Sequence, residues 1–185
     1  MRPRPHVTRP NLFLLLVVTA IALVHVLPSV AVEGDQHVDL PRNVADLRDA
    51  ILAAARSGNI EELKPVFKMG ALPDLGVAGA DDPIKILKSQ SADAEGREIL
   101  AALVNLLEMP PATKPIGRDI ENNSVYLWPY LAAKPLDKLT PSENVDLYRL
   151  VSPAKVTEMH EKKRWLWWCL AIAADGTWLT FKQIK

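Results

Sequence analysis

Residues 164–184 read RWLWWCLAIAADGTWLTFKQI. Two apolar runs flank Asp175-Gly176, a dipeptide that favours a type I′ turn between paired strands. This pattern predicts a β-hairpin with strands within 164–173 and 177–184. Side chains alternate across a strand, so one face would carry Trp165, Trp167, Cys169 and Ala171, and the other Leu166, Trp168, Leu170 and Ile172. Both faces are apolar, and we therefore expect the preceding helices to cover at least one of them.

Two helix starts precede the hairpin. Thr140-Pro141-Ser142-Glu143 has the form of a capping box, with threonine as N-cap and proline at the first helical position. Ser152-Pro153 opens a second helix that should run to about Lys163. Residues 125–131 form a dense aromatic stretch interrupted by Pro129. We expect an aromatic-rich α+β unit over 125–185, built from a helix pair and the C-terminal β-hairpin.

The preceding residues have helical periodicity. From Asn43 to Gly58 apolar residues recur at three- and four-residue steps, which is typical of a helix with one buried stripe. Asn59 is in position to cap a second helix that ends near Gly70. We expect a helical unit over 43–109. The proline-rich stretch that follows favours extended geometry and predicts a linker, or an edge-running strap, over 110–124.

A family resemblance lies in the helical unit. Residues 54–61 read AARSGNIE and are followed by Gly70-Ala71, which resembles the heart of an ankyrin repeat. Pro83 lies 33 residues after Ala50, the period of that family, and Gly96-Arg97-Glu98-Ile99 resembles part of a second copy. Neither copy has T-P-L-H, and the second glycine comes late, so the repeats are degenerate. The resemblance implies helical hairpins that bind proteins, and a generic helical hairpin pair is the alternative.

The expected fold class is thus α+β, with degenerate ankyrin-like N-terminal hairpins followed by a helix pair and a C-terminal β-hairpin. The N-terminus adds a targeting signal. Arg2, Arg4 and Arg9 precede an uncharged apolar run over 12–24, and Ser29-Val30-Ala31 is a small-x-small triplet. This order is typical of a secretory signal peptide, expected over 1–31, with a flexible leader over 32–42. A periplasmic or secreted location follows. The alternative is a retained membrane anchor, because the apolar stretch, if it is extended through His25 and Pro28 to Val32, is just long enough to span a bilayer.

Charge and cysteine content exclude some classes of function. Removal of the three signal arginines from 22 lysines and arginines leaves 19, against 22 acidic residues, a formal charge of −3. Nucleic-acid binding needs clustered basic residues, so no nucleic-acid partner is expected. Cys169 is the only cysteine, which excludes an intramolecular disulfide, and its apolar neighbours predict a buried side chain.

The sequence holds no familiar catalytic motif. It has no Gly-x-Ser-x-Gly, no His-Glu-x-x-His, no phosphate-cradling glycine loop and no histidines and cysteines at metal-ligand spacing. We therefore expect no cofactor and no metal. A hydrolase that uses scattered carboxylates is the least favoured of the alternatives.

Aromatic residues are the candidate binding groups. Tyr126, Trp128 and Tyr130 alternate along an extended segment, which could line a groove for an extended peptide. Trp165, Trp167 and Trp178 could stack on sugars, peptides or other apolar ligands, although core packing explains all six residues as well.

The aromatic block over 126–130, with Ala174-Asp175-Gly176-Thr177-Trp178, is similar to exported proteobacterial proteins that have no assigned activity. That similarity implies a bacterial, periplasmic protein. The leading expectation is a non-catalytic module of the cell envelope that binds a protein or peptide. The alternative is a module that binds cell-wall peptidoglycan on exposed tryptophans. The membrane would be contacted only through the signal segment before cleavage.

Overall fold

The computed structural model describes residues 39–78, 82–116 and 123–185. These residues belong to one compact unit, which spans Asp35–Lys185. The expected signal peptide (1–31) lies outside the described residues, as does most of the expected leader (32–42). In the part of the chain that is described, no helix is long and apolar enough to cross a membrane.

The N-terminal half of this unit is helical. Its elements are α1 (Arg42–Arg56), the 3₁₀ turn η1 (Ile60–Glu62), α2 (Leu63–Phe67), α3 (Pro83–Gln90) and α4 (Arg97–Leu107). The apolar stripe of the first helix is buried as its periodicity predicted, through Val44, Leu47, Ile51, Leu52 and Ala55. Pro65 lies inside α2 and lacks a backbone donor, and this helix extends over only five residues after the 3₁₀ turn.

A side-chain cap and a glycine mark the starts of η1 and α4. The side chain of Asn59 accepts a hydrogen bond from the Glu61 backbone N–H, as predicted for a cap. The backbone at Gly96, directly before α4, has a φ of +77°, and a Cβ there would lie 2.4 Å from Cδ1 of Ile60. Glycine at this position therefore lets the start of α4 pack closely against η1.

The strands form one antiparallel sheet in the described residues. Its order is β1-β2-β3-β4. The strands are β1 (Ala112–Pro115), β2 (Ser124–Trp128), β3 (Trp168–Ala173) and β4 (Trp178–Gln183). The predicted C-terminal hairpin is β3 and β4, with Leu170 opposite Phe181. The mixed α+β class is confirmed, and the sheet has two strands more than predicted. The stretch expected to be a linker or strap contributes the edge strand β1.

The turn between β3 and β4 differs from the predicted type I′. The N–H of Gly176 donates to the Ala173 carbonyl, and the N–H of Ala173 donates to the Thr177 carbonyl, both at 2.9 Å. The loop thus holds three residues, 174–176. Type I′ needs a positive φ at both central residues, yet Lys163 is the only non-glycine with a positive φ among the described residues. The predicted turn type was wrong, because Gly176 alone supplies the left-handed conformation of a three-residue loop.

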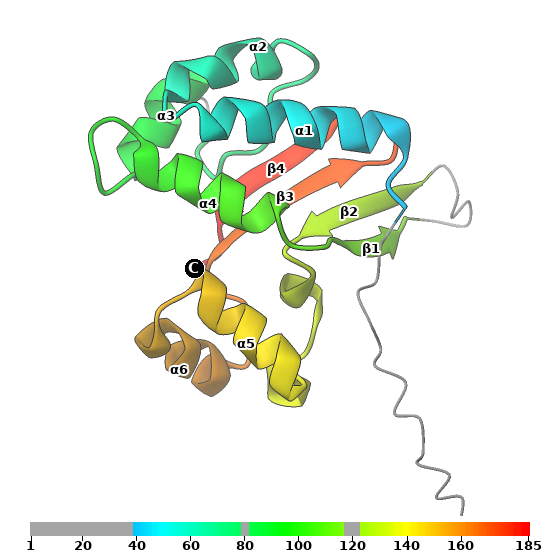
Figure 1. Cartoon of the computed structure of the whole chain (residues 1–185), viewed down its shortest axis with the longest axis vertical. Helices are drawn as coiled ribbons and strands as arrows, with labels where there is room; N and C mark the ends of the chain where they lie inside the picture. The colour runs from blue at the N-terminus through cyan, green and yellow to red at the C-terminus, as the bar shows by residue number, and fades with distance from the viewer. Residues whose placement is uncertain (1–38, 79–81, 117–122) are drawn as a thin grey trace, which may run out of the picture. The chain divides into compact units, whose positions relative to one another are not determined.

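Helices cover one face of the sheet and one end of the other face, and the buried residues form two clusters. The larger core joins α1–α4 to one sheet face, through Tyr126, Trp128, Trp168, Leu170, Ile172, Trp178 and Phe181. The smaller core joins α5 (Pro141–Leu150) and α6 (Pro153–Lys162) to Cys169 on the opposite face. Figure 1 shows α1 and α4 side by side over the sheet, with α5 and α6 apart from them. The expectation that the preceding helices cover at least one face of the hairpin is therefore met on the face that packs on α1–α4.

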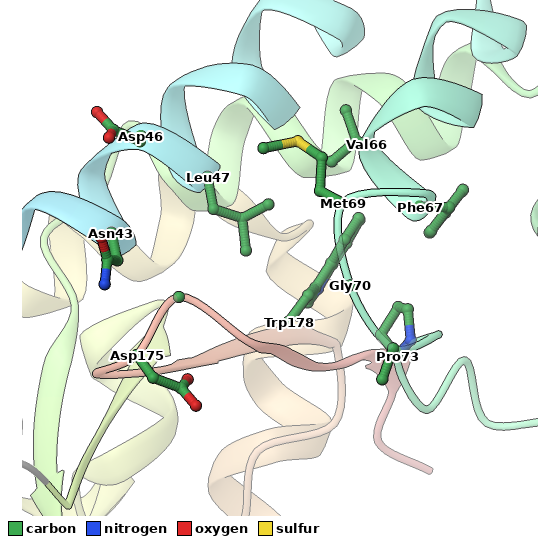
Figure 2. Close-up of a pocket in the computed structure, with 12 residues that line it drawn as sticks. Asn43, Asp46, Leu47, Val66, Phe67, Met69, Gly70, Pro73, Asp175 and Trp178 are labelled. Carbon is green, nitrogen blue, oxygen red and sulfur yellow. The ribbon is translucent and has the colours of Figure 1, made fainter.

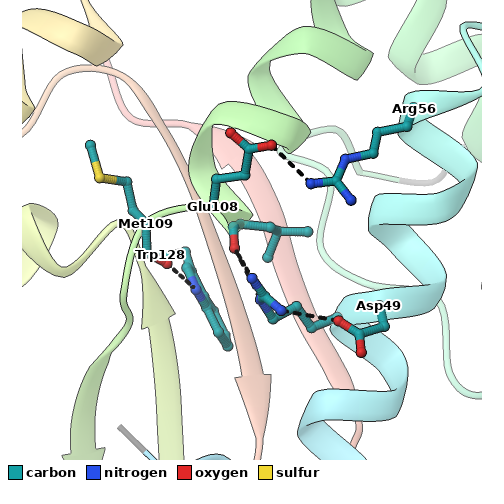
Figure 3. A network of polar contacts seen from close by, with 7 residues as sticks. Asp49, Arg56, Glu108, Met109 and Trp128 are labelled. Atoms are coloured by element: carbon teal, nitrogen blue, oxygen red, sulfur yellow. Dashed lines mark hydrogen bonds and ion pairs between the residues drawn. The ribbon is translucent and has the colours of Figure 1, made fainter. Parts of the chain in front are cut away.

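Polar contacts fix α4 to its neighbours (Figure 3). The guanidinium of Arg48 on α1 donates two hydrogen bonds, of 2.9 and 2.7 Å, to the Leu107 carbonyl at the end of α4. The final carbonyls of a helix lack partners within it, so this arginine caps the helix and complements its dipole. Close by, the Trp128 indole N–H donates to the Met109 carbonyl at 3.1 Å. These bonds connect α1, α4 and β2.

The loop after α2 runs beside β4. The backbone N–H of Asp74 donates to the Leu179 carbonyl, and the N–H of Phe181 donates to the Asp74 carbonyl, both at 3.0 Å. The Asp74 carboxylate also pairs with Lys182 on the same strand. The loop between α2 and α3 is thereby attached to the edge of the sheet opposite β1.

Candidate functional site

Four of the six candidate aromatic residues are buried. Tyr126, Trp128 and Trp178 belong to the larger core and Trp165 to the smaller one. The indole of Trp128 is fully buried and that of Trp165 donates to the Trp168 carbonyl at 3.0 Å. The structure therefore does not gather these residues into one exposed surface.

The other two candidates are half-buried. Trp167 packs against both cores. Its ring lies edge-on to the ring of Trp165, with the two ring centroids 6.3 Å apart. The hydroxyl of Tyr130 donates to Asp146 on α5 at 2.8 Å. Burial and this hydrogen bond raise the pKa of the Tyr130 hydroxyl. Tyr130 thus holds the 3₁₀ turn η2 (Tyr130–Ala133) against α5, and the stacking-platform interpretation depends on Trp167.

A cleft of about 250 Å³ lies between the start of α1, the loop after α2 and the β3–β4 turn (Figure 2). Its apolar lining consists of Leu47, Val66, Phe67, Met69, Pro73 and Trp178. Its polar side chains are Asn43, Asp46 and Asp175, and Gly70, Ala71 and Gly176 complete the wall. Trp178 is thus the one predicted binding residue that lines the cleft.

The floor of the cleft is aromatic. The rings of Phe67 and Trp178 stack with centroids 5.2 Å apart and planes 7° from parallel. The Trp178 indole N–H donates to the Thr180 carbonyl at 3.1 Å, so its polar group is satisfied within the protein. Trp178 is only 5% exposed, and this small exposed part is apolar with no unpaired donor.

The hairpin turn closes one end of the cleft by touching α1. A Cβ on Gly176 would lie 2.9 Å from the Cβ of Asn43 and 3.0 Å from its carbonyl oxygen. The φ of Gly176 is +88°, a conformation that side chains other than glycine rarely adopt. Glycine here satisfies both the turn and the close approach. The contact fixes the position of the neighbouring Asp175 relative to α1.

The rim combines an exposed apolar side chain with carboxylates. Met69 is 63% exposed, and its flexible thioether can adapt to the shape of a bound group. Asp46 on α1 contacts Arg42 at 3.7 Å. The Asp175 carboxylate accepts a hydrogen bond of 2.8 Å from the Thr177 N–H, which lowers the pKa of Asp175. No lysine or arginine is among the side chains that line this cleft.

These features suit non-covalent binding. The titratable groups of the lining are the two aspartates, and the thiol of Cys169 is buried in the smaller core, where burial raises its pKa. Within the described ranges, no group of three or more histidines, cysteines or acids could hold a metal ion. The cleft can remove an apolar group from water while carboxylates contact the polar groups beside it.

Sequence reasoning did not find this cleft as a site. Its walls come from residues 43–47, 66–73 and 175–178, which are far apart in the chain. The local signals that mark two of these segments, the Gly70-Ala71 pair and the Asp175-Gly176 turn, predict chain reversals and say nothing about which reversals meet. The meeting depends on how the larger core packs.

No protein-family model, curated protein or solved structure matches this chain. Its function is therefore inferred from the residues of the cleft and from the signals in its sequence.

Proposed function

We propose that this protein is an exported, non-catalytic module of the cell envelope that binds a protein or peptide partner, with the cleft beside Trp178 as its binding site. The observation that carries the proposal is the stacked floor of Phe67 and Trp178 below an exposed Met69. Such a surface is pre-organised to bury an apolar side chain of a partner.

The size of the cleft suits one anchoring residue. A volume of about 250 Å³ lies below the range of about 300–1,000 Å³ that is typical of sites for drug-sized ligands. Burial of one leucine-sized side chain contributes about 1.5–3 kcal/mol, which is too little for stable binding by itself. The partner would therefore insert one apolar residue and contact the rim on both sides of it, as an extended peptide or an exposed loop does.

The envelope location and the ankyrin relationship are parts of the same proposal. The basic, apolar and small-residue order over 1–31 supports export. The succession of two helical pairs, α1 with α2 and α3 with α4, supports a degenerate ankyrin-type origin for the N-terminal half. The A-A-x-x-G-x-x-E core over 54–61 points in the same direction.

One observation favours the glycan alternative. Of the five tryptophans, Trp167 alone retains partial exposure, whereas the other four are buried. A half-exposed indole can stack on a sugar ring. Peptidoglycan is therefore the second ligand to test, with Trp167 as the residue concerned.

The test compares two exposed apolar residues that are changed in the same way. Met69→Lys alters the cleft, and Val145→Lys alters a residue of α5 that is 62% exposed. We expect the wild type and Val145→Lys to capture the same envelope protein in a pull-down, and Met69→Lys to lose it. Urea unfolding curves should confirm that both variants fold.

Co-sedimentation with purified peptidoglycan accompanies this pull-down. Sedimentation that Trp167→Ala abolishes and Met69→Lys leaves unchanged would favour the glycan module instead. Capture that survives Met69→Lys undiminished would contradict the cleft as the binding site.

A further inference from the structure

The methionines of this chain differ in their access to solvent. There are four, of which Met1 belongs to the expected signal peptide. Met109 and Met159 are 4% and 0% exposed and lie in the smaller core, whereas Met69 is 63% exposed. An oxidant in solution can therefore reach the side chain of Met69 in the folded protein. It can reach the other two only when the smaller core opens.

Met69 is also part of the cleft. Its backbone N–H donates to the Val66 carbonyl at 3.1 Å, which ties its main chain to the end of α2. Figure 2 shows the thioether extending from the loop after α2 toward α1, which carries Leu47. Met69, Leu47 and Trp178 line the same cleft. A chemical change at the sulfur of Met69 thus alters the wall of the cleft and leaves both cores filled.

We infer that Met69 is a modification site, whose oxidation to methionine sulfoxide makes the cleft unfavourable for apolar side chains. This inference rests on the proposed function and adds a form of regulation to it. Oxidation converts a flexible apolar side chain into a polar one. The apolar anchor of a partner would then pack against a hydrated oxygen in place of a thioether.

The reaction transfers one oxygen atom from a peroxide. A lone pair of the Met69 sulfur attacks one oxygen of hydrogen peroxide, the O–O bond breaks and an S–O bond forms. The departing hydroxide takes up the proton of the transferred hydroxyl, which gives water. The sulfur is oxidised by two electrons and the peroxide is reduced, and methionine sulfoxide reductases can reverse the change.

The cleft offers little to stabilise the new oxygen. No lysine or arginine is among the described residues that line it, and the Trp178 indole N–H already donates to the Thr180 carbonyl at 3.1 Å. Figure 2 shows the Asn43 amide on the far side of Leu47 from Met69. A partner that covers the sulfoxide would therefore displace its water. Burial of a polar group without a hydrogen-bond partner corresponds to about a tenfold loss of affinity.

The first part of the experiment locates the oxidation. The folded protein, purified from the envelope fraction, is treated with hydrogen peroxide, and mass spectrometry of its tryptic peptides finds the added oxygen. We expect Met69 to be oxidised first, while Met109 and Met159 react only in urea. The urea midpoint should be unchanged after oxidation of Met69, because its exposed side chain supports neither core.

The second part measures binding with a nine-residue peptide that has a central leucine flanked by serines. In ¹⁵N-labelled protein the peptide should shift the NMR signals of the Trp178 indole and the Gly176 amide. Oxidised wild type should bind it about ten times more weakly, and methionine sulfoxide reductases should restore the affinity. Met69→Leu is the control, since peroxide should not change the affinity that this variant has before treatment.

Three results would overturn the inference. One is oxidation of Met109 or Met159 in the folded protein as fast as oxidation of Met69. Another is equal affinity of the oxidised and unoxidised wild type, which leaves the proposed function intact. The third is a peroxide effect that persists in Met69→Leu. Failure of the unoxidised protein to bind the peptide, with capture of the envelope protein that survives Met69→Lys, would instead refute the proposed function and this regulation with it.

Discussion

The larger and the smaller core are built on opposite faces of one sheet, yet they are held together differently. In the larger core, aromatic rings of the sheet pack on each other and on the helices, as Trp168 does on Phe181 at 4.7 Å and Trp178 on Phe67 at 5.2 Å. The smaller core is mostly aliphatic, with Leu147 and Met159 fully buried. Ring burial thus dominates on one face, and shorter side chains fill the other.

Local polar contacts stabilise the helices of the smaller side, as others do on the larger side. Thr140 and Glu143 form a complete capping box at the start of α5. Glu143 also pairs with Lys134, and this ion pair contributes to a lowered pKa of Glu143. A cap contributes about 1 kcal/mol, whereas a buried aromatic ring contributes about 3–5 kcal/mol. The two sides thus differ in how many aromatic rings they bury, whereas polar contacts stabilise the helices on both.

The largest effect is expected in the aromatic core. Trp168→Ala should lower the free energy of unfolding by about 3–5 kcal/mol, because it removes a buried ring that stacks on Phe181. Trp167→Ala should cost less, since the Trp167 ring is only half-buried. Urea unfolding monitored by circular dichroism measures both. If both variants lose the same free energy of unfolding, the two rings contribute equally to stability. That result would contradict the proposed difference between the two faces.

The next effect concerns the contact that closes the cleft. Gly176→Ala should destabilise the protein by about 1–3 kcal/mol, because the new Cβ would meet Asn43 and the φ of +88° strains any other residue. Gly58→Ala is the matched control, with a φ of +73° and no heavy atom within 4 Å of the added Cβ. Urea unfolding should show a greater loss for Gly176→Ala. The same loss in both would indicate backbone strain alone.

A smaller effect is expected at the cap of α5. Thr140→Ala should cost about 1 kcal/mol, because the Glu143 N–H would lose its acceptor. Ser152→Ala, at the start of α6, should cost less, since its bond to the Lys155 N–H is long at 3.4 Å. Thermal melts of the two variants provide the comparison. A loss at Thr140 that approaches the loss at Trp168 would contradict the minor role given to single caps.

The smallest effect is the pH dependence of an exposed ion pair. Hydrogen bonds from Lys64 and then Lys88 lower the pKa of Glu61 from 4.5 to about 2. A lowered pKa in the folded state stabilises the protein above pH 4.5, and this contribution is lost as the pH falls toward 2. We therefore expect the urea midpoint to drop between pH 5 and pH 2.5, and to drop less in Glu61→Gln.

Glu158→Gln serves as the comparison for this titration. Glu158 also has a pKa lowered to about 2, but its partners Lys155 and Lys162 lie in the same helix. Glu61, in contrast, joins η1 to Lys88 on α3. If both variants flatten the pH dependence of the urea midpoint by the same amount, the ion pair between η1 and α3 stabilises the protein no more than the pairs within α6.

The helices could be predicted because their signals are local. The buried stripe of α1, the Asn59 cap and the Thr140 capping box are all read from residues within one or two turns of each other. The β3–β4 hairpin was also predictable, since apolar runs on both sides of Asp175-Gly176 pair across a short loop. The type of turn could not be predicted, because it depends on whether the loop has two residues or also includes Ala174.

The remaining strands and the cleft depend on contacts between distant residues. Residues 112–115 read ATKP, are mostly exposed and become a strand only by pairing with β2. From the sequence alone, Trp128 could line a groove or belong to the core. In the structure it is buried in the larger core, and its indole N–H donates to the Met109 carbonyl. The cleft likewise exists only once α1 meets the turn at Gly176.

The Asp74 loop has a consequence for how this protein behaves at high concentration. An uncovered sheet edge is a template on which other molecules can add strands and grow fibrils. Here the β4 edge is occupied by the Asp74 backbone, and the β1 edge is short and carries Lys114 and Pro115, which discourage strand addition. By covering the β4 edge, the Asp74 loop therefore protects solubility. Detachment of this loop would expose a β4 edge competent for self-association and would also remove Leu75 from the larger core.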